Sequence, residues 1–218
     1  MPEHTFWSRE FDARNLLPEG WQADIRSIAE KFATNRVLHP RSVTSRESAD
    51  VVGVKVMTVG GRIIRRELPW LHTFYEHEFR ALGSLCVQEP VASAQDDRYG
   101  VNLNVQLGNE MRYECHVDSN PLEGLLYVTD HSDGRGGELV VANNTEAHSV
   151  QEVDSDCTLV IPREGRLLFF DARRHPHYVR PLQDPSAVRI VVAMNYYLPS
   201  WPESMRPPDL NRHLFGED

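Results

Sequence analysis

The chain has 218 residues, of which 40% are hydrophobic, and its 23 Lys and Arg stand against 32 Asp and Glu for a formal net charge of -9. This length and apolar content suit one domain built around one core. The acidic balance leaves no basic surface to neutralise phosphates, so nucleic acids and anionic membranes are excluded as expected partners.

The cysteines and the lack of long apolar runs bear on the cellular compartment. Cys86, Cys115 and Cys157 are odd in number and form no C-x-x-C pair, so we expect reduced thiols. No apolar run approaches the ~20 residues that span a bilayer, and Met1 to His4 do not open a cationic and apolar leader. A soluble, cytoplasmic protein is therefore expected.

The N-terminal half carries two helical patterns and one strand pattern. Apolar residues recur every three or four positions within residues 21–32 and again within residues 71–82, so each segment is predicted to form a helix with one apolar face. Between them, residues 51–59 are rich in β-branched side chains and predict a strand. Gly60 and Gly61 then predict a hairpin turn into a second strand.

The pattern changes at residue 101 into short runs of β-branched and aromatic residues separated by Gly, Pro, Asn and Asp. These runs predict a mainly β fold with flanking helices: a double-stranded β-helix of the jelly-roll, cupin-like type, with the N-terminal helices packed outside. We expect a single domain over residues 1–218, with 1–98 as helical and β support, 99–198 as catalytic core and 199–218 as a loosely structured tail. The predicted strands lie near residues 101–107, 112–118, 125–129, 137–142, 157–161, 166–170, 177–181 and 188–197.

A His-x-Asp triplet, His116 with Asp118, is the first sign of chemistry. On a strand, residues i and i+2 project from the same face, so this imidazole and this carboxylate converge on one point. A second triplet, His131 with Asp133, is followed by turn-forming residues that disfavour a strand, and it stays as an alternative. The alternative for the first triplet is an ordinary charged pair on an exposed strand.

A third metal ligand and an anion-binding arginine follow further along the chain. Two imidazoles and one carboxylate hold Fe(II) on one face and leave three positions open, and His177, after a turn, is placed to complete such a set. His175 shares its parity, but Pro176 keeps it in the turn. Arg189 begins a strongly apolar strand, where a guanidinium needs an anionic partner such as a ligand carboxylate. A surface position at the strand end is the alternative for Arg189.

These residues together resemble the Fe(II)- and 2-oxoglutarate-dependent oxygenases, particularly the prolyl-4-hydroxylase-like branch. The resemblance implies that His116, Asp118 and His177 are catalytic iron ligands, with Fe(II), 2-oxoglutarate and O2 as cofactors and ascorbate as an in vitro reductant. The motifs that carry it are residues 116–118, 125–129, 136–140, 165–170, 177–179 and 189, within about residues 99–198.

The resemblance also implies which residues bind the cosubstrate. Arg189 would bind the distal carboxylate of 2-oxoglutarate, Tyr127 would add a hydrogen bond to it, and Gln106 would supply a further contact. Plain packing in the β core is the alternative for Tyr127. Two positions after the arginine the family frequently has Ser or Thr, whereas this chain has Val191, so we expect weaker binding of 2-oxoglutarate.

The activity implied by the resemblance is hydroxylation of an unactivated C–H bond in a small polar metabolite, such as an amino acid or a natural-product intermediate. Desaturation and cyclisation stay open, whereas Asp118 argues against halogenation, because related halogenases have a small residue there. The alternative is a non-catalytic or cofactor-independent cupin-like metal-binding protein. The expected partner is a small-molecule substrate, and the oligomeric state is left open.

Three further polar residues are candidates for substrate binding, because they share a strand face with the predicted site. Arg112 and Glu114 have the parity of His116, and Asn195 has the parity of Arg189. Histidines outside the motifs are expected at the surface or on helix faces, namely His72, His77, His148 and His213.

Overall fold

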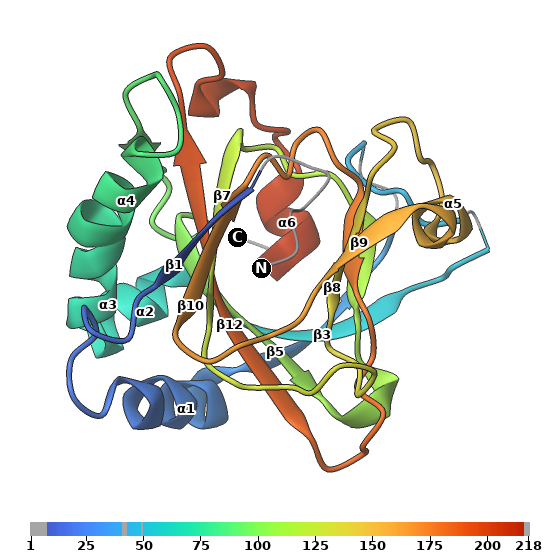
Figure 1. The fold of residues 1–218 in the computed structure, drawn as a ribbon, viewed down its shortest axis with the longest axis horizontal. Coiled ribbons are helices and arrows are strands. Elements are labelled where there is room, and N and C mark those ends of the chain that lie inside the picture. The colour runs from blue at the N-terminus through green and yellow to red at the C-terminus, as the bar shows by residue number, and fades with distance from the viewer. Residues whose placement is uncertain (1–7, 41–42, 49, 216–218) are drawn as a thin grey trace.

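The computed structural model describes residues 8–40, 43–48 and 50–215, which fold into two facing sheets with all strands antiparallel (Figure 1). The facing sheets confirm the predicted jelly roll. The larger sheet has the order β1 (Ser8–Asp12), β10 (Arg166–Phe170), β7 (Leu122–Tyr127), β12 (Val188–Tyr197), β5 (Val101–Leu107), β3 (Val54–Val59) and β2 (Thr34–Leu38), with β4 (Ala92–Ser93) also paired to β12. The smaller sheet has the order β6 (Tyr113–His116), β11 (His177–Val179), β8 (Leu139–Ala142) and β9 (Cys157–Val160).

Alternation along β12 explains how one strand serves both faces of the larger sheet. Ile190 and Val192 belong to the core under the helices, whereas Val191 and Ala193 belong to the core between the two sheets. Both sets are apolar because β12 lies in the middle of its sheet. The strands β5, β10 and β12 have the bounds that the sequence predicts, and the other predicted strands of this region differ by a few residues at their ends.

Both predicted helices are present on the outer face of the larger sheet (Figure 1). The first is α1 (Trp21–Phe32). The second is continuous but changes its winding, because α3 (Pro69–Phe74) and α4 (Arg80–Ser84) are joined by a π-helical turn, residues Tyr75–Phe79. The helices pack on the sheet through their predicted apolar faces, including the buried Ile25, Leu71 and Phe79.

The predicted hairpin at Gly60 and Gly61 is wrong. Residues Gly61–Glu67 form helix α2, and the antiparallel partners of β3 are β2 and β5. A Cβ on Gly61 would lie 2.1 Å from the carbonyl oxygen of Asp97 and 2.6 Å from that of Val101. Position 61 therefore needs glycine because two backbone segments approach closely, and not because the chain turns there.

The N-terminal part of the chain is interleaved with the part that follows residue 99. It supplies β1, β2 and β3 to the larger sheet, and residues 44–46 lie along β6 of the smaller one. Val117 N–H donates to the carbonyl of Thr44 at 2.9 Å, and Arg46 N–H donates to that of Cys115 at 2.7 Å. The chain before residue 99 is therefore part of both sheets.

The prediction of a loosely structured tail is also wrong for the described residues up to 215. Residues Glu203–Met205 form a 3-10 turn, and α6 (Leu210–Phe215) lies across the mouth between the sheets (Figure 1). Asp96 holds the tail, because its carboxylate accepts hydrogen bonds from Arg206 at 2.9 Å and Asn211 at 2.5 Å.

Two expectations about the compartment can be compared with the fold. All three cysteines are free, as expected. Among the helices of the described residues, none is long and apolar enough to cross a membrane.

Candidate metal and cosubstrate site

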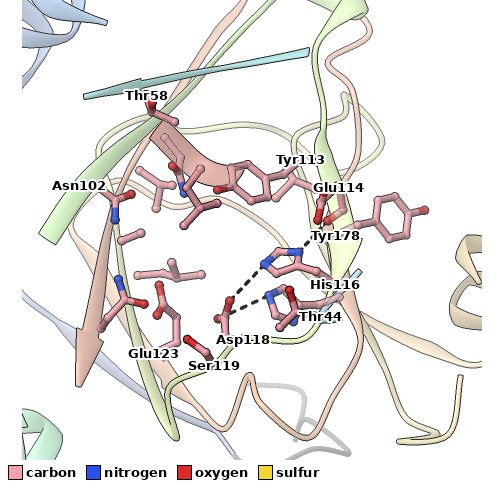
Figure 2. Close-up of a pocket in the computed structure, with 18 of the residues that line it drawn as sticks. Thr44, Thr58, Asn102, Tyr113, Glu114, His116, Asp118, Ser119, Glu123 and Tyr178 are labelled. Atoms are coloured by element: carbon pink, nitrogen blue, oxygen red, sulfur yellow. Dashed lines mark hydrogen bonds and ion pairs between the residues drawn. The ribbon is translucent and has the colours of Figure 1, made fainter. Parts of the chain in front are cut away.

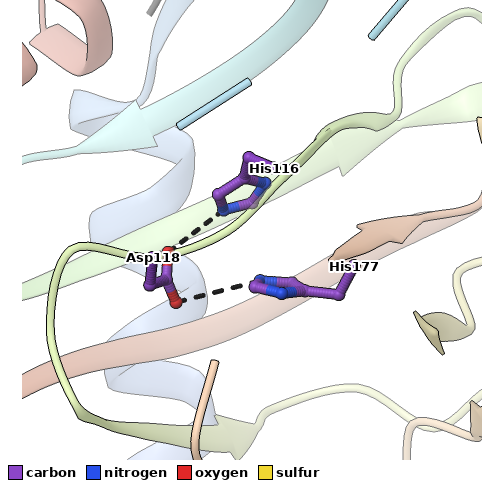
Figure 3. A group of neighbouring side chains, drawn as sticks. All are labelled: His116, Asp118 and His177. Atoms are coloured by element: carbon purple, nitrogen blue, oxygen red, sulfur yellow. Dashed lines mark hydrogen bonds and ion pairs between the residues drawn. The ribbon is translucent and has the colours of Figure 1, made fainter. Parts of the chain in front are cut away.

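The structure brings His116, Asp118 and His177 together at one end of the smaller sheet (Figure 3). His116 ends β6, Asp118 lies in the following loop, and His177 begins β11 directly opposite His116. His116 Nε2 lies 3.1 Å from Asp118 Oδ1, and His177 Nε2 lies 3.8 Å from Asp118 Oδ2. One donor atom from each residue lies within 4.8 Å of the others, which is close enough for a shared metal ion.

Backbone carbonyl groups orient both imidazoles. His116 Nδ1 lies 2.8 Å from the carbonyl oxygen of Glu114, and His177 Nδ1 lies 2.9 Å from that of His175. A carbonyl oxygen only accepts, so each Nδ1 carries the hydrogen and each Nε2 faces Asp118. Metal-binding histidines usually have such a partner on the second nitrogen. The donor set therefore fits a metal such as Fe(II).

The pKa values of the two histidines shift in opposite directions. Burial, together with the nearby His116, lowers the pKa of His177 to about 4, so His177 is a neutral imidazole. Burial would also lower the pKa of His116, but the hydrogen bond and negative charge of Asp118 raise it to about 9. Binding of a metal must therefore release a proton from the pair formed by His116 and Asp118.

His175, the alternative to His177, is turned away from this group. Its Nδ1 lies 2.9 Å from the carbonyl oxygen of Ala142. The second triplet, His131 with Asp133, does not join a set of three potential ligands among the described residues.

Arg189 is buried in the same pocket, with 1% of its surface exposed. Its Nε donates to the carbonyl of Gly137 at 2.9 Å, and no carboxylate of the described residues forms an ion pair with it. Gly137 has a φ of +78°, and a Cβ there would lie 3.2 Å from Arg189 Cδ, so glycine makes room for the arginine. A buried guanidinium without a carboxylate is costly, and a ligand anion would offset that cost.

Tyr127 lies beside this arginine. The guanidinium carbon of Arg189 is 5.7 Å from the centre of the Tyr127 ring, and the Tyr127 hydroxyl is buried without a hydrogen-bond partner among the described residues. Burial raises the pKa of Tyr127 to about 12, so the hydroxyl keeps its proton and can donate. Val191, two positions after Arg189, faces the same pocket and adds no hydrogen bond.

The other candidate residues have mixed positions. Glu114 and Asn195 line the pocket, whereas Gln106 and Arg112 do not. Gln106 Nε2 donates to the carbonyl groups of Met111 and Arg180, both at 3.3 Å. Arg112 forms a two-pronged ion pair with Glu47, at 2.5 and 2.8 Å, so its guanidinium is occupied by the protein itself.

Sequence reasoning missed several residues of this pocket. Glu123 and Asn102 line one wall on the larger sheet and face His116 and Glu114 of the smaller sheet (Figure 2). Burial raises the pKa of Glu123 well above its ordinary value, and the charge of Asp118 raises it further. Strand parity is the signal that could have found Glu123, because it lies two and four positions before the inward-facing Leu125 and Tyr127.

Helix α6 forms the roof of the pocket. Leu210, Leu214 and Phe215 line it, and His213 Nε2 lies 3.1 Å from Glu114 Oε1. His213 was expected at the surface or on a helix face, and it lies on α6, but its contact with Glu114 was not predicted. The tail has little periodicity from which its position could be predicted.

A jelly roll with two imidazoles, one carboxylate and a buried arginine in one pocket is typical of mononuclear iron enzymes that use a keto acid. Residues 100–197 match the model of the 2OG-Fe(II) oxygenase superfamily. The chain is an Fe(II)- and 2-oxoglutarate-dependent dioxygenase, with Fe(II), 2-oxoglutarate and O2 as its cofactors.

Solved structures share the fold at low sequence identity. AviO1 from Streptomyces viridochromogenes Tue57 has a TM-score of 0.64 at 14% identity, over 90% of this chain and 92% of that one. HygX from Streptomyces hygroscopicus, with nickel and 2-oxoglutarate bound, has a TM-score of 0.60 at 14% identity, over 89% of this chain and 84% of that one. A prolyl hydroxylase from Trichoplax adhaerens, in complex with a peptide fragment, has a TM-score of 0.58 at 16% identity, over 92% of this chain and 86% of that one. Comparison with curated protein sequences gives no match.

Proposed function

We propose that this enzyme hydroxylates an unactivated C–H bond of a small polar metabolite, such as an amino acid or a natural-product intermediate. His116, Asp118 and His177 hold the Fe(II) in this proposal. Arg189, with the hydroxyl of Tyr127, binds the distal carboxylate of 2-oxoglutarate. The bound iron and keto acid supply the activation of O2, and the protein positions one C–H bond beside them.

The observation that carries this proposal is the state of Arg189. Its guanidinium is buried in the same pocket as the three potential ligands and has no carboxylate partner among the described residues. The unpartnered hydroxyl of Tyr127 beside it supplies a second donor. Three potential metal ligands, a buried guanidinium and a hydroxyl beside it match the two functional ends of a keto acid with a distal carboxylate.

The walls and the roof of the pocket favour a small substrate. Leu125, Phe170 and Ala193 line it with apolar surface, which excludes water from the reacting bond. Helix α6 covers the mouth and contributes Phe215 to the lining. Among proteins of this fold, one structure of HygX has hygromycin B bound, whereas the Trichoplax enzyme is in complex with a peptide fragment. The helix α6 over the pocket favours a small-molecule substrate over a peptide.

Arg189 and the converging triad also argue against the alternative of a non-catalytic cupin-like protein. Such a protein needs no buried guanidinium beside its metal, and no carboxylate of the described residues explains the presence of Arg189.

The test has two parts. The protein loaded with Fe(II) and 2-oxoglutarate under argon should develop a weak visible charge-transfer band, because the keto acid chelates the metal. With O2 and ascorbate, it should form succinate, and a metabolite library should contain compounds that raise the rate. A folded, iron-loaded protein with neither the band nor succinate formation would refute the proposal.

A further inference from the structure

We propose that the substrate carries a protonated amine and that Glu123 is the residue that binds it. This inference rests on the proposed function, because it assigns the substrate to the pocket beside His116, Asp118 and His177.

Glu123 is a buried carboxylate held in a fixed orientation. Only 5% of its surface is exposed, and it lines the pocket opposite the smaller sheet (Figure 2). The fully buried Asn120 donates from Nδ2 to Glu123 Oε2 at 3.0 Å, and the Tyr99 hydroxyl donates to Asn120 Oδ1 at 2.9 Å. No Lys, Arg or His of the described residues forms an ion pair with Glu123. Its orientation is fixed without a cation of the protein.

The charges of the loaded pocket leave Glu123 without a counterion. Iron(II), the Asp118 carboxylate, the 2-oxoglutarate dianion and the Arg189 guanidinium together carry no net charge. Arg189 is the only Lys or Arg that lines the pocket among the described residues. Burial disfavours the ionised form of Glu123, and a cationic group on the substrate would stabilise that form.

A second carboxylate points to the same ligand chemistry. Glu114 is 2% exposed and lines the pocket. Its Oε1 contacts His213 at 3.1 Å, whereas its Oε2 is buried without a hydrogen-bond partner among the described residues. An unpartnered carboxylate oxygen favours a ligand that donates hydrogen bonds.

The amide side chains of the pocket also leave acceptors free. Asn195 and Asn102 both direct Nδ2 to the carbonyl oxygen of Tyr99, at 2.7 and 3.4 Å, so their oxygens take no part in that contact. Asn104 Oδ1 is buried without a partner among the described residues. An ammonium group carries three donors and no acceptor, so it complements this set better than a hydroxyl or a carboxylate does.

The experiment compares amines with alcohols of the same shape. Benzylamine, cyclohexylamine and 1,6-diaminohexane, each with its alcohol counterpart, are titrated against the protein loaded with Ni(II) and 2-oxoglutarate, with binding measured by calorimetry and ligand-observed NMR. The wild type should bind amines about tenfold or more tightly than the alcohols, as a charge-assisted hydrogen bond predicts. Glu123→Gln should lose this preference, because glutamine keeps the acceptor for Asn120 and removes only the charge.

Two controls separate the charge of Glu123 from other effects. Glu110→Gln removes the same charge at an exposed site paired with Lys55, and it should keep the amine preference. Glu123→Leu supplies a second variant without charge, in case Glu123→Gln does not fold.

Either of two results would overturn the inference. One is an absence of amine preference in wild-type protein that binds Ni(II) and 2-oxoglutarate. The other is a preference that survives in the folded Glu123 variants, as expected if Glu123 is only a structural hydrogen-bond acceptor. Failure of the proposed function would look different, because the wild type itself would then bind no metal or no 2-oxoglutarate.

Discussion

His116 and His177 lie directly opposite each other in the ladder between β6 and β11, with their ring centres 4.4 Å apart. The pairing that forms the smaller sheet therefore also assembles two of the three candidate ligands. The backbone N–H of Asp118 donates to the carbonyl of Ala172 at 3.0 Å, which holds the loop after β6 against the segment that leads to β11. A bound metal would tie these two strands together through their side chains as well.

We predict that His177→Ala abolishes tight metal binding, with a loss of about 100-fold or more in affinity, because a three-residue site loses one ligand. His175→Ala is the matched control. It keeps the backbone carbonyl that orients His177, so metal affinity should stay near the wild-type value. Retention of Co(II) or Fe(II) after gel filtration under argon measures both. The reverse order of effects would make His175 the ligand.

Arg189→Ala should weaken 2-oxoglutarate by about 2–4 kcal/mol, because the distal carboxylate loses a charge-assisted, two-pronged partner in a dry pocket. Metal affinity should barely change. Arg180→Ala serves as the control, since Arg180 pairs with Asp154 in a partly exposed position. Titration of 2-oxoglutarate against metal-loaded protein measures the effect, and unchanged affinity in the Arg189 variant would contradict the proposed role.

Asp118→Ala and Asp118→Gly should abolish hydroxylation and weaken iron binding, because the metal loses its anionic ligand. Efficient chlorination is not expected in chloride buffer, since a halogenating pocket must also hold the substrate radical away from hydroxide. Product analysis by mass spectrometry, with bound iron measured in parallel, checks both statements. Full hydroxylation in these variants would move the iron to another site, such as His131 with Asp133.

The hydrogen bonds on Asp96 predict how acid affects the tail. Burial alone would raise the pKa of Asp96, but hydrogen bonds from Asn211 and Arg206 lower it to about 2. A carboxyl group in an unfolded chain titrates near pH ~3.9. The stabilisation from Asp96 is therefore complete above that value and is lost as the pH falls toward about 2.

Asp96→Asn should accordingly destabilise the protein at neutral pH by about 1 kcal/mol or less, because partial exposure screens the charges. The difference between variant and wild type should shrink steadily below pH ~4. Urea unfolding of both proteins over a series of pH values gives this difference. A difference that stays constant down to pH ~3 would exclude the low pKa of Asp96 as its cause.

Strands were predictable where the local signal and the tertiary environment agree. The β12 segment is rich in β-branched and aromatic residues on both faces, because each face packs against a core, and its bounds follow from the sequence. The Gly60-Gly61 pair is compatible with a hairpin turn and also with the start of a helix. In the structure, Gly61 lies close to the carbonyl groups of Asp97 and Val101, and no local sequence pattern contains these contacts.

The residues of the candidate site also fall into those that local sequence patterns predict and those that they do not. Strand parity places His116 beside Asp118 and Glu114 on the pocket face, since all of these lie on or next to one strand. Parity failed for Arg112, because its partner Glu47 lies 65 positions earlier in the chain and has no strand pattern around it. His213 was missed for the same reason, since its contact with Glu114 spans 99 positions.

The strand β1, near the start of the chain, pairs with β10, which is synthesised much later. In the pairing of β1 with β10, Ser8 lies opposite Phe170 and Asp12 opposite Arg166. During synthesis on the ribosome, β1 therefore has no partner until most of the chain has been made, and closing so long a loop slows folding. Until then, the edge of β10 or β1 is open to pairing with other chains. Slower translation or a holdase chaperone should therefore affect the yield of this enzyme more than it affects its final stability.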